Sequence, residues 1–212
     1  ILITCMKIKN EFKSMSFYNY KMQIIGLLGH QGVGKNYIAE IVLPKILSQK
    51  NTVVLAFADH FKIDCISKHN ADYNKVYGQK DYETRKLLQK VGTEEGREVF
   101  GYDIWIKTLH NWIKVLHSRG VKRFIISDVR FQNEVEWIKS LNGIIIKINA
   151  PNRYQNRLET ETGNNIDKIN EIKNHPSEVN IDNIEIYDIL VNNDYNDNIE
   201  KQLLHSIILC NL

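Results

Sequence analysis

The chain has 212 residues, a formal net charge of +3 and a hydrophobic content of 43%. This length suits one α/β domain with a full core and is short for two. The composition is typical of a globular protein and excludes a largely disordered one. The weak positive charge, without a Lys/Arg tract, argues against a nucleic-acid partner, and no apolar run reaches the roughly 18 residues of a membrane helix. Cys5, Cys65 and Cys210 lie far apart, which favours the reducing cytoplasm over disulfides or a zinc site.

Strand and helix patterns alternate from residue 22 onward, and we expect residues 1–21 to be a disordered extension. Helical periodicity follows the first strand, fills much of the chain up to about residue 118, and returns around residues 135–141 and 198–209. Short apolar runs predict five strands, at residues 22–28, 51–57, 121–127, 143–148 and 184–191.

Alternating strands and helices predict an α/β fold with a parallel five-stranded sheet and helices on both faces. Residues 150–180 are polar, rich in Asn and weakly periodic, which is typical of a mobile segment over a site. We therefore expect a single domain over residues 22–212 with a small lid-like region at about 150–180.

A glycine-rich loop joins the first expected strand to the helix after it. Residues 29–35 read Gly-His-Gln-Gly-Val-Gly-Lys and match the Walker A pattern G-x-x-x-x-G-K. Glycines let the backbone wrap around an anion with its N–H groups inward, and Lys35 reaches the β- and γ-phosphates at the positive end of the helix. A chance match is the alternative, but the strand-to-helix context favours ATP binding by Gly29, Gln31, Gly32, Val33, Gly34, Lys35 and Asn36.

Two residues are candidates for holding Mg²⁺. Asn36 stands where the pattern usually has Ser or Thr, and its amide oxygen is also a hard ligand. Asp128 ends the third expected strand, where its carboxylate could orient Mg²⁺ waters or the acceptor. Capping of the helix that follows is the alternative for Asp128.

Several strings beyond the loop resemble the viral and phage deoxynucleoside monophosphate kinases. They are FADHFK at 57–62, LQKVGTEEGR at 88–97 with GYDIW at 101–105, DVRFQNE at 128–134 and HPSE at 175–178. His60 departs from this family's usual Pro. The resemblance implies a P-loop nucleoside-monophosphate-kinase-like fold, transfer of the γ-phosphoryl group of ATP to a deoxynucleoside monophosphate, and Mg²⁺. It also allows a homodimer and, for a viral protein, a location in the host cytoplasm.

A phosphorylated acceptor requires cations around both the moving phosphoryl group and its own phosphate. Arg130 follows an expected strand, at the sheet edge where ligands bind, and with Lys35 and Asp128 it forms the predicted catalytic set. Arg85 and Arg97 could complete a bidentate clamp on the acceptor phosphate, although a solvated helix charge is the alternative for each.

The remaining candidates surround these residues. Asp59, Lys62 and Asp103 could contact the acceptor, with helix capping as the alternative for Asp59 and simple solvation as the alternative for Lys62. Trp105 could stack on the acceptor base, although it shares a helical stripe with Leu109 and Trp112 that is more typical of a core. In the polar segment the candidate lid arginine over ATP is Arg153, with Arg157 in reserve.

Two other functions stay open from the sequence. Phosphomevalonate kinases share the architecture and a S-D-x-R-x-x-x-x-x-W string, which Ser127-Asp-Val-Arg130 and Trp137 fit. A nucleotide-binding switch or regulatory ATPase is the alternative of another class. The L-Q-x-x-G-T-E and D-V-R-F-x-N-E strings favour a deoxynucleoside monophosphate kinase.

Overall fold

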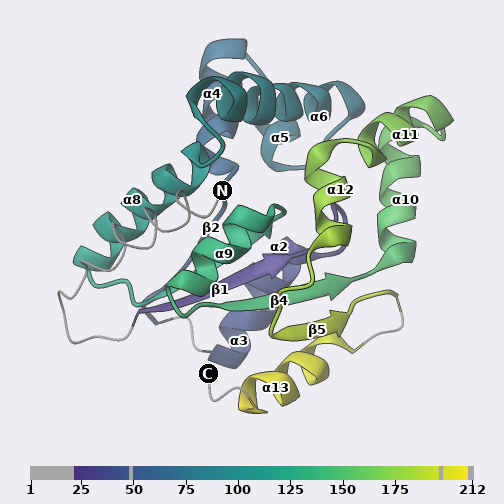
Figure 1. Ribbon diagram of the computed structural model, residues 1–212. Coiled ribbons are helices and arrows are strands. Elements are labelled where there is room, and N and C mark those ends of the chain that lie inside the picture. The colour runs from purple at the N-terminus through teal and green to yellow at the C-terminus, as the bar shows by residue number, and fades with distance from the viewer. Residues whose placement is uncertain (1–21, 48–49, 196–197, 210–212) are drawn as a thin grey trace.

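The computed structural model describes residues 22–47, 50–195 and 198–209, so the expected extension at residues 1–21 lies outside the described residues. Five parallel strands form the central sheet of this described part, in the order β2-β3-β1-β4-β5 (Figure 1). The predicted five-stranded parallel sheet is thereby confirmed. The strands are β1 Gln23–Leu28, β2 Thr52–Leu55, β3 Arg123–Val129, β4 Ile144–Asn149 and β5 Ile189–Asn192.

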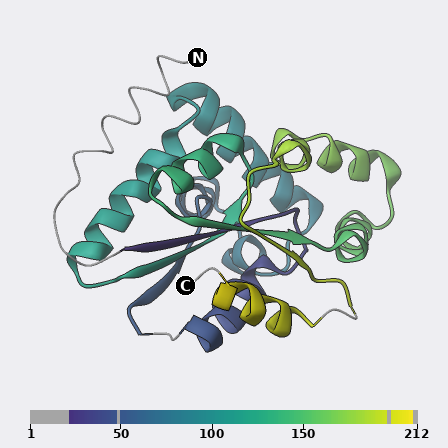
Figure 2. The ribbon, with the colours of Figure 1, turned by 60° about the horizontal axis from the view of Figure 1, so that its bottom comes forward.

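Helices cover both faces of this sheet (Figures 1 and 2). On one face lie α2 (Lys35–Tyr37), the π-helical turn η1 (Ile38–Val42), α3 (Leu43–Leu47) and α13 (Ile199–Leu209). The opposite face carries α8 (Ile104–Ser118) and α9 (Gln132–Ser140). Because β1 is covered on both sides, its run of apolar residues is buried almost throughout. Each face has its own core cluster, with Ile38 and Leu203 on one side and Ile113 and Val135 on the other.

The remaining helices gather at the end of the sheet where the glycine-rich loop leaves β1. Those between β2 and α8 are α4 (Asp59–His69), α5 (Tyr73–Tyr77), α6 (Tyr82–Gln89), the π-helical η2 (Lys90–Arg97) and α7 (Glu98–Phe100). Figure 1 shows α4 to α6 at the top and α10 to α12 at the right. None of the helices in the described part of the chain combines the length and the apolar character needed to cross a membrane.

Residues 150–180 were expected to be a mobile segment with little regular structure. They fold into helices instead, which corrects that prediction. The helices are α10 (Pro151–Thr162), α11 (Ile166–Lys173) and α12 (Pro176–Asn183). Capping explains their bounds: proline opens α10 and α12, and Asn165 accepts a hydrogen bond from the backbone N–H of Lys168 at 3.0 Å. We refer to residues 150–183 as the α10–α12 segment.

The last strand is shorter than predicted. Residues 184–188 were expected to begin it, yet β5 starts at Ile189 and ends at Asn192. The carboxylate of Asp188 accepts a hydrogen bond from the backbone N–H of Ile145 at 2.8 Å and pairs with Lys139 at 2.7 Å. The Asp188 side chain therefore satisfies the backbone N–H of Ile145 near the start of β4, just before β5 begins.

Candidate active site

The glycine-rich loop has the backbone conformation that anion binding requires. Gly32 and Gly34 have φ values of 74° and 91°, which L side chains rarely adopt. Lys35 is buried, and its ammonium group donates to the carbonyl oxygens of Gly29 and His30 at 2.6 and 2.5 Å. Burial, and next the charge of Arg130, lower the pKa of Lys35 to about 7. A loop of this form fits a phosphate chain, with the lysine held against its inner side.

A cavity of about 410 Å³ opens from this loop. Its walls come from the loop, the residues after β2, the end of β3 and the residues that follow it, the helical segment from α4 to η2, the start of α8, and the α10–α12 segment. Cationic side chains dominate the lining, whereas its acidic residues are Asp128 and Glu134. Such an excess of positive charge suits a ligand with several phosphates. The cations are Lys35, Lys62, Lys80, Arg85, Arg97, Arg130 and Arg157.

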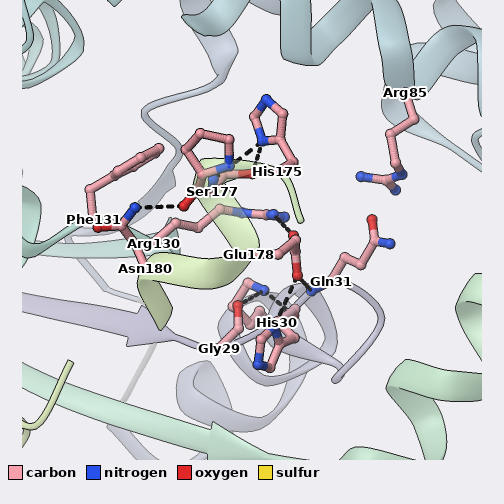
Figure 3. A network of polar contacts seen from close by, with 12 residues as sticks. Gly29, His30, Gln31, Arg85, Arg130, Phe131, His175, Ser177, Glu178 and Asn180 are labelled. Atoms are coloured by element: carbon pink, nitrogen blue, oxygen red, sulfur yellow. Dashed lines mark hydrogen bonds and ion pairs between the residues drawn. The ribbon is translucent and has the colours of Figure 1, made fainter. Parts of the chain in front are cut away.

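Arg130 follows β3 and is held by a carboxylate on α12 (Figure 3). Glu178 is 1% exposed and forms an ion pair with Nη1 of Arg130. Its Oε2 also pairs with Nδ1 of His30 at 3.0 Å and accepts from the backbone N–H of Gln31 at 3.4 Å. Burial alone would raise the pKa of Glu178, but Arg130, His30 and Lys35 outweigh it and lower the pKa to about 2. Glu178 of the HPSE string therefore joins Arg130 to the glycine-rich loop.

His30 also connects the glycine-rich loop to the α10–α12 segment. Its Nε2 contacts Oδ1 of Asp182 at 2.8 Å, and its ring stacks on Tyr154 of α10 with centroids 4.4 Å apart. Burial opposes protonation, but the hydrogen bonds and charges of Glu178 and Asp182 prevail and raise the pKa of His30. The loop is thus tied to both α10 and α12.

This raised pKa predicts a pH-dependent stability. A histidine whose pKa is higher in the folded state stabilises the fold fully below its unfolded pKa, and the contribution is lost as pH rises through the folded value. We expect wild type to exceed His30→Gln in unfolding temperature at about pH 6 and the difference to shrink by about pH 9. Thermal unfolding of both proteins measures it. An equal difference at both pH values would contradict the assignment.

Arg97 forms part of the cavity wall through a second buried pair. Its Nη2 contacts Oε1 of Glu134 at 2.5 Å, and its guanidinium lies over the ring of Phe131 at 4.0 Å. The other oxygen of Glu134 accepts from the backbone N–H groups of Arg130 and Phe131 at 2.8 and 3.1 Å. Burial raises the pKa of Glu134 to about 7 although Arg97 opposes this. One glutamate thus fixes both the side chain of Arg97 and the backbone of Arg130.

Asp128 lines the cavity and also ties two strand ends together. Its oxygens accept from the backbone N–H groups of Phe57 and Ala58 at 2.8 and 2.9 Å. It lies within β3, so the alternative of a helix cap is wrong. Asn36 is exposed at the cavity. Among the residues that the structure describes, no three His, Cys, Asp or Glu side chains form a metal cluster. Mg²⁺ would need only one or two protein ligands beside phosphate oxygens, and the predicted ligands Asn36 and Asp128 both line the cavity.

Several predicted residues lie elsewhere. Asp59 lies in the first turn of α4 and lines a separate cavity of about 340 Å³. Its carboxylate accepts a hydrogen bond from the backbone N–H of Ala56 at 3.0 Å. Asp103 accepts from Nδ2 of Asn133 at 2.7 Å and does not line the main cavity. Val33 packs into the core, while Gly29 contributes its carbonyl oxygen to Lys35.

The α10–α12 segment brings Arg157, the reserve candidate, to the cavity in place of Arg153. The guanidinium of Arg153 lies over the ring of Tyr195 at 4.8 Å. Arg157 is one turn further along α10, and its side chain packs so closely that a Cβ added to Gly32 would lie 2.7 Å from its Cβ. The absence of a side chain at Gly32 therefore allows α10 to approach the loop.

The far wall of the cavity is aromatic and apolar. Trp105 is 7% exposed, and its Nε1 donates to the carbonyl oxygen of Gly92 at 2.7 Å. It packs against Phe61, with centroids 5.1 Å apart, so it belongs to the core and to the cavity wall at once. Tyr77 and Leu88 complete this wall. A planar ring would find a suitable surface here.

Lys80 is a cavity residue that the sequence patterns do not reveal. It lies between α5 and α6, outside every family-like string, and follows Gly78 by two residues. Burial, followed by the charges of Lys62, Arg85 and Arg157, lowers the pKa of Lys80 to about 8.

The family model for Phosphomevalonate kinase matches residues 27–143. A protein of Acanthamoeba polyphaga mimivirus named "Putative deoxynucleotide monophosphate kinase" is 34% identical over 194 residues, which cover 81% of this chain and 89% of that protein. The solved structure of a sugar kinase from Janibacter sp. HTCC2649 has 12% identity and a TM-score of 0.45, covering 89% of this chain and 93% of its own.

Proposed function

The chain belongs to the deoxynucleoside monophosphate kinase family of P-loop kinases, and we propose that it transfers the γ-phosphoryl group of ATP to a deoxynucleoside monophosphate, giving the diphosphate and ADP. The observation that carries this proposal is the 34% identity over 89% of the mimivirus protein. That match covers 81% of this chain, more than the phosphomevalonate kinase match at residues 27–143.

The donor end of the cavity is the glycine-rich loop. We assign ATP to it because Gly32 and Gly34 have left-handed φ values and the Lys35 ammonium lies against the inner side of the loop. Asn36 and Asp128 would hold Mg²⁺, which supplies positive charge to the β- and γ-phosphates when bound. Lys35 adds a further cation from the inner side of the loop.

The acceptor end is the space between Arg130 and the aromatic wall. Arg130 and Arg97 are held by buried carboxylates, which restrict them to positions where their planar donor groups can grip the acceptor phosphate. Arg85 and Lys62 line the same cavity. A base would lie against Phe61 and Trp105, which supports a nucleotide as the acceptor.

The α10–α12 segment is the proposed lid. Arg157 faces the cavity from α10, and Ser177 and His175 face it from the α12 end. A closed lid excludes the water that would otherwise accept the phosphoryl group. We further propose a cytoplasmic location, in the host cell for a viral protein. The homodimer stays a prediction.

An acceptor panel separates this function from its rivals. Release of ADP is measured with ATP and Mg²⁺, adding each deoxynucleoside monophosphate in turn and mevalonate 5-phosphate separately. At least one deoxynucleoside monophosphate is expected to raise ADP release, whereas mevalonate 5-phosphate is not. Turnover of mevalonate 5-phosphate alone would favour the function of the family that matches residues 27–143. ADP release that no acceptor stimulates would favour a regulatory ATPase.

A further inference from the structure

A buried carboxylate on α10 connects two arginines of the cavity without lining the cavity itself. The Glu161 side chain is 0% exposed. Its Oε2 accepts from Nε of Arg85 at 2.7 Å, and its Oε1 accepts from Nη2 of Arg85 at 2.9 Å. Oε1 also pairs with Nη2 of Arg157, one turn earlier on α10, at 2.5 Å. Both oxygens of one carboxylate are therefore engaged by cations from two different elements.

The two arginines belong to opposite sides of the site. Arg85 comes from α6, on the side of the proposed acceptor, whereas Arg157 packs over Gly32 of the phosphate loop. Each lines the cavity. Glu161 therefore links an arginine on the proposed acceptor side to one on the donor side, from a position outside the cavity lining.

Glu161 leaves part of each arginine for a ligand. Its contacts with Arg85 use Nε and Nη2, and its contact with Arg157 uses Nη2. A guanidinium has donors on Nη1 as well, arranged in a planar fork. One carboxylate shared by two arginines also leaves a net positive charge beside the cavity. This arrangement orients the arginines and does not neutralise them.

Other contacts also hold α6 to α11. Glu171 of α11 accepts a hydrogen bond from Tyr82 and pairs with Lys86 at 3.3 Å, and Lys168 lies over the Tyr82 ring at 4.2 Å. These contacts are exposed and do not reach the cavity. The buried Glu161 contacts differ from them, because both arginines that Glu161 holds line the cavity.

We propose that Glu161 is a positioning residue that sets Arg85 and Arg157 for the phosphates of acceptor and donor together, so that closure of the α10–α12 segment and assembly of the phosphate site are one event. The inference rests on the proposed kinase function. Since a misplacement of about 1 Å can cost about 100-fold in rate, losing this support should slow turnover strongly.

The test compares Glu161→Gln with Glu159→Gln, a matched change two residues away. Glu159 contacts Gln155 on the same helix at 2.7 Å and does not line the cavity. Glu161→Gln is expected to lower kcat by about 10- to 100-fold and to raise KM for both ATP and the deoxynucleoside monophosphate. Glu159→Gln should match wild type. Unchanged kinetic constants in folded Glu161→Gln would overturn the proposal, as would lower stability with unchanged kcat.

A double-mutant cycle measures the coupling between Arg85 and Arg157, which would not depend on Glu161 if its role were purely structural. Arg85→Ala and Arg157→Ala should be non-additive in kcat/KM in wild type and additive in the Glu161→Gln background, because Glu161 is the link between them. Equal coupling in both backgrounds would contradict the link. If Glu161→Gln does not fold, Glu161→Asp keeps the charge but is too short to reach both arginines, and a loss of coupling is expected from it as well.

Failure of the proposed function would look different. If wild type phosphorylated no deoxynucleoside monophosphate, the kinase assignment would fall. Titration calorimetry with ATP would then still test the donor half of the inference. Weaker ATP binding by Glu161→Gln than by Glu159→Gln would support it, and equal binding would overturn it.

Discussion

Lys35→Met is expected to lower kcat by about 100- to 1000-fold or more, since the proposed role of Lys35 is to place a cation at the phosphoryl group that moves. The ammonium group of Lys35 is buried and lies between the carbonyl oxygens of Gly29 and His30, on the inside of the loop. Initial rates of ADP formation at saturating ATP and acceptor measure the effect.

Stability separates this loss from misfolding. Burial lowers the pKa of Lys35 to about 7, so the folded state binds this proton less tightly than the unfolded state and the charged lysine costs stability near neutral pH. Lys35→Met should therefore unfold at or above the wild-type temperature. Lys45→Met is the control, because Lys45 is exposed and pairs with Glu200 on the surface. A Lys35 variant with wild-type kcat would refute phosphate binding at this loop.

Glu178→Gln should produce the second large effect, on stability and on the acceptor together. The Glu178 carboxylate is buried against Arg130 and His30. Losing one partner of a buried ion pair costs about 3–5 kcal/mol in the free energy of unfolding. Arg130 would also lose the group that positions it, so KM for the acceptor should rise and kcat should fall. Denaturant unfolding and steady-state kinetics measure the two effects.

Two comparisons make the Glu178 prediction specific. Glu185→Gln, an exposed glutamate beyond α12, should leave both stability and kinetics unchanged. The double variant Glu178→Gln/Arg130→Gln should be less destabilised than the sum of the single variants, because it leaves no unpaired buried charge. Strict additivity would mean that the pair does not act as a unit. The lowered pKa of Glu178, about 2, further predicts that its contribution is present above its unfolded pKa and is lost as pH falls toward 2.

The sheet and the loop were predictable because their signals are local. A buried parallel strand reads as a continuous apolar run, and a phosphate loop needs glycines at fixed offsets. Both hold for β1 and residues 29–35. The strand end at Arg130 and the HPSE string pointed to residues that meet in space through Glu178.

The α10–α12 segment was harder to predict because its helices bury few apolar residues. α11 buries Ile172 alone, and α10 buries Leu158 together with the polar Glu161 and Thr162. Such a pattern has almost no apolar stripe. The choice between Arg153 and Arg157 then depends on which face of α10 approaches Gly32, and that is a tertiary contact. The sequence did not point to Glu161 or Lys80 for the same reason, because their places at the cavity also depend on tertiary contacts.

Transfer of a phosphoryl group from ATP to a deoxynucleoside monophosphate in this cavity can be observed directly, because donor and product carry different phosphorus groups. Phosphorus NMR of a reaction with ATP, Mg²⁺ and each deoxynucleoside monophosphate follows donor and product in one spectrum. We expect a deoxynucleoside diphosphate and ADP in equal amounts with at least one base, and far less of both products in the same time with Lys35→Met. Inorganic phosphate and ADP without any deoxynucleoside diphosphate would rule out this transfer.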